Sequence, residues 1–137
     1  MLKLIVLQGL PGSGKTTWAR NYVKGRKDYV IVNRDSIRHM RGDYWIPEQE
    51  DLITEIEDMC IELSLRKGYN VIVDATNFRG LNRFRDITVR FIDPIDVELK
   101  IFDTPLEECI LRDSKRESSV GENVIKGMYK KYLKQSV

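Results

Sequence analysis

Short apolar runs punctuate this chain at regular intervals. Residues 2–7 are almost continuously apolar, and similar runs follow at residues 29–32, 70–73 and 97–102. Short runs rich in β-branched residues are typical of strands that are buried on both faces of a sheet. We therefore predict four strands, with the first of them in the centre of the sheet.

Between the runs, apolar residues recur at helical spacing, in segments 15–23, 47–67, 82–91 and 124–133. A further helix is expected after Thr104-Pro105-Leu106-Glu107, which has the spacing of a capping box. Because strands alternate with helices, we expect an α/β fold whose parallel sheet is flanked by helices with right-handed crossovers.

The longest predicted helix, residues 47–67, carries a stripe of apolar residues that recur every three or four positions. This stripe is expected to face the core, and its members are Leu52, Ile53, Ile56, Met59, Cys60 and Leu63. Gly68 follows the last of them and is expected to end the helix.

Length and composition restrict the class of protein. A chain of 137 residues has room for one domain, residues 1–137, and its 42% of hydrophobic residues exclude a disordered chain. The net charge of +2 is too small to indicate nucleic-acid or membrane binding by itself, so a polyanion site has to come from local clustering. No apolar run approaches the ~18 residues that span a bilayer, and we expect a cytoplasmic protein with Cys60 and Cys109 reduced and buried.

A phosphate-binding loop follows the first predicted strand directly. Residues 9–16 read Gly-Leu-Pro-Gly-Ser-Gly-Lys-Thr and match G-x-x-x-x-G-K-[ST] without a mismatch. The glycines allow successive N–H groups to point inward, and the helix that follows adds its positive end. We expect ATP phosphates to bind Gly9, Gly12, Ser13, Gly14 and Lys15, with Mg²⁺ on the Thr16 hydroxyl and Thr17 as a helper.

A phosphate loop does not distinguish a kinase from a hydrolase or a switch, so the acceptor side has to decide. Asp35 follows the second strand, where a carboxylate could take the proton of an attacking hydroxyl, and Arg38 lies one helical turn later. An ordinary surface ion pair at a helix start has the same spacing. Tyr44 and Trp45 follow, and could stack on an acceptor base or pack on the core.

Two further polar clusters are candidates for the site. Asp74 ends the third apolar run, as an acid that orients Mg²⁺ water does, although Asp74 and Asn77 could equally satisfy backbone groups at a turn. Arg112 and Arg116 are spaced by four residues in a polar segment, 112–123, that we interpret as a basic lid over the transferred phosphoryl group. A solvated basic helix end is the alternative.

Taken in order, these motifs resemble the 5′-kinase domain of phage-type polynucleotide kinase. The resemblance rests on the phosphate loop followed by Thr-Trp-Ala-Arg20, on Asn33-Arg-Asp-Ser-Ile-Arg38, on Asp74-Ala-Thr-Asn77 and on Arg112-Asp-Ser-Lys-Arg116. It implies a P-loop kinase fold and transfer of the ATP γ-phosphate to the 5′-hydroxyl end of DNA or RNA.

The resemblance also implies a role for each site residue. Asp35 matches the general base, and Arg38 the contact to the 3′-side phosphate of the acceptor. Lys15 and Thr16 match the phosphate and metal contacts, Arg116 matches the lid arginine, and Asp74 matches an acid that supports the site. We expect Arg112 and Arg116 to bind the nucleotide.

Other functions remain possible at this stage. A P-loop kinase of a small-molecule hydroxyl has the same loop, and an ATP-dependent binding module could use the lid to recruit a partner. No Asp-x-Asp occurs in the sequence, so the 3′-phosphatase activity that accompanies the phage enzyme is not expected.

Overall fold

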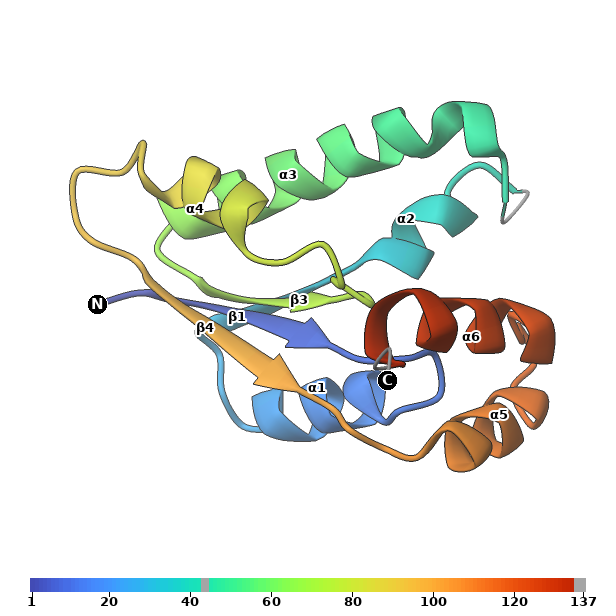
Figure 1. Cartoon of the computed structure of the whole chain (residues 1–137). Helices are drawn as coiled ribbons and strands as arrows, with labels where there is room; N and C mark the ends of the chain where they lie inside the picture. The colour runs from blue at the N-terminus through green and yellow to red at the C-terminus, as the bar shows by residue number, and fades with distance from the viewer. Residues whose placement is uncertain (43–44, 135–137) are drawn as a thin grey trace.

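One four-stranded parallel sheet organises the chain (Figure 1). The computed structural model describes residues 1–42 and 45–134. The strand order is β2 (Tyr29–Asn33), β3 (Asn70–Asp74), β1 (Lys3–Gln8) and β4 (Asp96–Ile101). The prediction of a four-stranded parallel sheet with the first strand inside it is confirmed.

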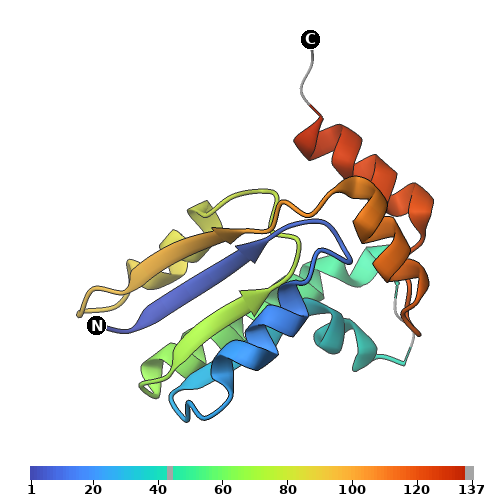
Figure 2. The ribbon, with the colours of Figure 1, turned by 90° about the horizontal axis from the view of Figure 1, so that it is seen from below.

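Helices cover both faces of the sheet, because alternate residues of the inner strands point to opposite faces. On one face, Ile5 and Leu7 pack with α1 (Lys15–Val23). On the other, Leu4 and Val6 pack with α3 (Glu50–Arg66) and α4 (Asn82–Thr88). Figure 1 shows the sheet between these layers, and Figure 2 shows it from the side of α1.

The carboxyl ends of the strands carry the remaining helices, α2 (Arg34–His39), α5 (Leu106–Ser114) and α6 (Glu122–Met128) (Figure 1). At this edge, β1 is followed by the phosphate loop, β2 by the turn of α2 that contains Asp35, and β3 by the segment after Asp74. In an open α/β sheet this edge is where ligands bind. The fold therefore brings the candidate residues to one place.

The apolar stripe predicted for α3 is wrong at four of its six positions, since Ile53 is buried and Ile56 packs on the core as expected. Leu52, Met59, Cys60 and Leu63 are exposed, whereas the helix buries Ile53, Glu57, Ile61 and Leu65. The buried row follows the i, i+4 ridge of the helix, and its second member is a glutamate. A search for apolar residues passes over such a row because one of its positions reads as polar.

Several element ends also differ from expectation. Residues 47–49 form a 3₁₀ turn before α3, α4 ends at Thr88, and α6 gives way to a π-helical turn over Tyr129–Leu133. The capping box is wrong: α5 begins at Leu106, and the Thr104 hydroxyl instead donates to the carbonyl of Ser13, 2.8 Å away. Thr104 therefore ties α5 to the phosphate loop.

Of the two cysteines, only Cys109 is buried, and its thiol donates to the carbonyl of Thr104. Cys60 is exposed because it lies on the outer side of α3. Across residues 1–42 and 45–134, no helix is long and apolar enough to cross a membrane.

Candidate active site

The phosphate loop has the backbone that its sequence predicts. Gly12 and Gly14 have φ of +80° and +100°, in the left-handed region that favours glycine. A Cβ at Gly12 would lie 2.4 Å from the carbonyl oxygen of Cys109, so the loop and α5 touch there. Ser13 is buried, and Thr17 is exposed in the first turn of α1.

Lys15 is folded back into the loop. Its Nζ donates to the carbonyls of Gly9 and Leu10, at 2.9 and 2.7 Å, and to Ser13 Oγ at 3.2 Å. Burial lowers the pKa of Lys15 to about 8, and attraction to Asp74 opposes this shift. Phosphates that bind in the loop would replace these carbonyls as partners of Lys15 Nζ, and they carry full negative charge.

This buried lysine predicts proton uptake on nucleotide binding. Above about pH 8 Lys15 is neutral in the free protein, and bound phosphates favour its charged form, so binding should raise its pKa and take up a proton. Calorimetric titration with ADP at pH 8.5, in two buffers of different ionisation heat, should give uptake of at least about half a proton. At pH 6.5 the uptake should vanish. Equal heats in both buffers at pH 8.5 contradict the prediction.

Asp74 joins the phosphate loop to β2. Its Oδ2 accepts from the Thr16 hydroxyl at 2.6 Å and from the Asn33 side-chain amide at 2.8 Å. The alternative role as a turn residue belongs to Asn77, whose amide donates to the carbonyl of Leu7 at 2.7 Å. Because the Thr16 hydroxyl donates a hydrogen bond to Asp74, its oxygen keeps its lone pairs available for a cation.

The donor set around Thr16 fits Mg²⁺. A hydroxyl and a carboxylate are hard oxygen ligands, and Mg²⁺ is usually held by one or two such groups, together with waters and substrate phosphates. Among the described residues no group of three or more His, Cys, Asp or Glu side chains could hold a metal alone. Thr16 and Asp74 would therefore share the ion with the nucleotide.

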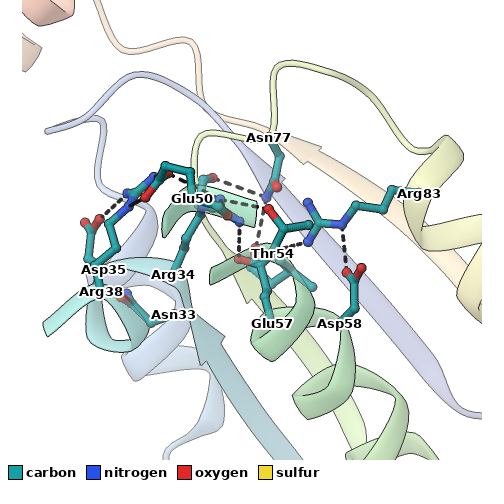
Figure 3. A network of polar contacts seen from close by, with 12 residues as sticks. Asn33, Arg34, Asp35, Arg38, Glu50, Thr54, Glu57, Asp58, Asn77 and Arg83 are labelled. Carbon is teal, nitrogen blue, oxygen red and sulfur yellow. Dashed lines mark hydrogen bonds and ion pairs between the residues drawn. The ribbon is translucent and has the colours of Figure 1, made fainter. Parts of the chain in front are cut away.

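Asp35 and Arg38 lie on one face of α2, as predicted. Arg38 Nη1 donates to Asp35 Oδ1 at 2.9 Å. A residue that the sequence analysis missed, Glu50 of α3, takes the other edge of the guanidinium: Nε and Nη2 of Arg38 donate to its two oxygens at 3.0 and 2.6 Å. This pairing with Arg38 lowers the pKa of Glu50. Arg38 is therefore held between two carboxylates (Figure 3).

The same network continues beneath α2. Arg34 donates to Thr54 Oγ1 at 2.9 Å and pairs with Glu50 at 3.3 Å and with Glu57 at 3.5 Å. Glu57 also pairs with Arg83 of α4. These residues were missed too; the available signal was the position of Glu57 in the i, i+4 row that begins at Ile53. The network fixes α2 on α3 and α4 (Figure 3).

The two lid arginines lie on the other side of the loop. Arg112 pairs with Glu108 at 3.0 Å, and its Nη1 lies 3.4 Å from the position of a Cβ on Gly14. Arg116 pairs with Asp113 at 2.7 Å. The charge of Arg116 contributes to the lowered pKa of Lys15, whereas Asp74 and Asp35 oppose that shift. Trp45 is exposed beside Arg38, whose guanidinium lies 5.5 Å from the ring centre, and Tyr44 lies outside the described residues.

Two curated relatives match nearly the whole chain. The L-seryl-tRNA(Sec) kinase of Methanococcus maripaludis is 31% identical over 94% of this chain and 52% of its own length. The putative bifunctional polynucleotide kinase/RNA ligase of Autographa californica nuclear polyhedrosis virus is 32% identical over 96% of this chain and 21% of its own. This chain thus spans about half or less of these relatives.

Comparison with solved structures agrees with the fold. A chain in the structure of the Pnkp1/Rnl/Hen1 RNA repair complex superimposes with a TM-score of 0.76 and 33% identity, over 96% of this chain and 44% of that one. The P-loop kinase fold and the resemblance to polynucleotide kinases are confirmed. A family model described as AAA domain, AAA_33, matches residues 4–134, and the chain belongs to this family of P-loop kinase-type domains.

Proposed function

We propose that this protein transfers the γ-phosphate of ATP to the 5′-hydroxyl end of a nucleic acid, with Asp35 as the general base. The observation that carries the proposal is the ion pair of Asp35 and Arg38 on one face of α2, at the sheet edge where β1 ends and the phosphate loop begins. The similarity to a viral polynucleotide kinase/RNA ligase and to a chain of an RNA repair complex supports it.

The proposed reaction is an in-line displacement. Asp35 takes the proton of the 5′-hydroxyl, whose oxygen forms a bond to the γ-phosphorus while the bond from that phosphorus to the β–γ bridging oxygen breaks. Lys15 and Arg116 stabilise the charge that develops, and ADP leaves with the electron pair of the broken bond. Bound Mg²⁺, held by Thr16 with the support of Asp74, would neutralise phosphate charge.

A panel of acceptors tests this function. We expect label from [γ-³²P]ATP on the 5′ ends of DNA or RNA oligonucleotides that carry a 5′-hydroxyl, and none on oligonucleotides that are already 5′-phosphorylated. An ATP-dependent binding module would label no acceptor. A kinase of small-molecule hydroxyls would label nucleosides more efficiently than oligonucleotides, whereas the proposed enzyme should use nucleosides only as poor acceptors.

A second candidate function follows from the similarity to the L-seryl-tRNA(Sec) kinase. In that case the acceptor is a hydroxyl attached to a tRNA rather than a strand end. Both candidates use the same loop and base, so the acceptor decides between them. Transfer of label to seryl-tRNA, with none to 5′-hydroxyl oligonucleotides, would select the second.

Arg38 should serve the acceptor rather than ATP. Its guanidinium is oriented by Glu50, and a cation there suits an acceptor phosphate. For Arg38→Ala we expect the KM of a dinucleotide with a 3′-phosphodiester to rise about 10- to 100-fold, the effect of losing a charge-assisted hydrogen bond. The KM for ATP should change little. A plain nucleoside, which lacks that phosphate, is the matched control acceptor and should show no such rise.

A further inference from the structure

The carboxylate of Asp113 is the most buried charged group at the base of the lid, residues 112–123. It lies in the last turn of α5 and is 1% exposed. A buried carboxylate is tolerated only when hydrogen bonds replace its hydration. Here every partner that replaces the water comes from the lid itself.

Three groups converge on this carboxylate. Oδ1 accepts from Arg116 Nη2 at 2.7 Å and from the backbone N–H of Val120 at 3.1 Å, and Oδ2 accepts from the N–H of Gly121 at 3.0 Å. Burial alone raises the pKa of Asp113, but these hydrogen bonds outweigh it and hold the pKa below its ordinary value. The group is therefore an anion at neutral pH, and it closes the lid segment into one turn.

The backbone of Asp113 is fixed on the phosphate loop. A Cβ at Gly12 would approach the Cys109 carbonyl oxygen to 2.4 Å and the Asp113 nitrogen to 3.3 Å. The bond from Thr104 to Ser13 anchors the start of the same helix. The Asp113 side chain therefore holds the Arg116 guanidinium at a fixed position relative to the phosphates that the loop would bind.

Asp113 contacts one edge of the Arg116 guanidinium. The Arg116 side chain is 40% exposed, and in the part of the chain that the structure describes Asp113 is the partner of its guanidinium. Its partner Asp113 lies against the phosphate loop at Gly12, and the charge of Arg116 contributes to lowering the pKa of Lys15. The opposite edge of the guanidinium keeps its donors for a phosphate.

We propose that Asp113 is a positioning residue, which aims Arg116 at the transferring phosphoryl group. The inference rests on the proposed function, because it needs Arg116 to act in transfer. A latch that keeps Arg116 away from the nucleotide is the opposite reading of the same contact, and it predicts the opposite sign: removal of Asp113 would then speed transfer.

A double-mutant cycle tests the proposal. We expect Asp113→Ala to lower kcat about 10- to 100-fold, part of the 10³- to 10⁵-fold effect of a complete arginine contact, with less change in the KM for ATP. Asp113→Asn keeps one acceptor oxygen and should lose less. In the Arg116→Ala background, Asp113→Ala should cost less than about twofold more. Glu117→Ala, at an exposed acid in the same segment, is the matched control and should leave kcat unchanged.

The outcomes separate cleanly. An equal loss of kcat from Asp113→Ala in both backgrounds would mean a structural role alone and would overturn the proposal. A rise in kcat for Asp113→Ala, or an unchanged kcat for Arg116→Ala, would overturn it as well. If Asp113→Ala does not fold, Asp113→Asn completes the same cycle. The cycle is run both on transfer to a 5′-hydroxyl end and on the slow transfer to water. Label that reaches only water refutes the proposed acceptor while the cycle on hydrolysis still tests Asp113.

Discussion

Asp35→Asn should retain nucleotide binding and lose phosphoryl transfer by roughly 10²- to 10⁴-fold, the usual contribution of a general base. Asparagine has the shape of aspartate, and its carbonyl oxygen can still accept from Arg38 Nη1, which donates to Asp35 Oδ1 at 2.9 Å. What the variant removes is the proton acceptor. The measurement is kcat for transfer of labelled phosphate to a 5′-hydroxyl oligonucleotide.

Two controls make this result specific. The affinity for ADP, measured by calorimetry, should match that of the unmodified protein, because the phosphate loop is intact. Asp51→Asn removes an exposed acid in the first turn of α3 and should leave transfer unchanged. Turnover by Asp35→Asn within about threefold of the parent would remove Asp35 from the mechanism and leave positioning as the main catalytic contribution.

Sequence alone predicts the backbone of the phosphate loop well, because each part of the loop is local. The phosphate loop, its lysine and its threonine are consecutive residues between one strand and one helix, and their backbone requirements appear directly as glycines. The pairing of Asp35 with Arg38 is similarly local, one helical turn apart. Such features need no knowledge of the tertiary structure.

The contacts that sequence reasoning missed join residues that are far apart in the chain. Glu50 meets Arg38 from twelve residues away, and Asp74 meets Thr16 from fifty-eight. Thr104 was assigned to its own helix, yet it bonds to Ser13 instead. In each case the partner comes from another element, so only the fold reveals it.

The buried face of α3 was misread because a charge occupies it, and that charge predicts a large loss of stability. Glu57 is fully buried, with Arg83 on one oxygen and Arg34 Nη1 3.5 Å from the other (Figure 3). For Glu57→Ala we expect the free energy of unfolding to fall by about 3–5 kcal/mol, because it takes one carboxylate from two partly buried guanidinium groups and opens a cavity in the packed row.

Urea unfolding measures this loss. The matched control is an acid of the same helix that lies outside the packed row. Glu55→Ala, at an exposed acid of the same helix, should stay within about 0.5 kcal/mol of the parent. Glu57→Gln keeps the shape and the hydrogen-bonding oxygen but not the charge, so it should lie between the two. If Glu57→Ala and Glu55→Ala unfold at the same urea concentration, the ion network is not what joins α2 and α4 to α3. That junction would then rest on the apolar members of the row, Ile53, Ile61 and Leu65, alone.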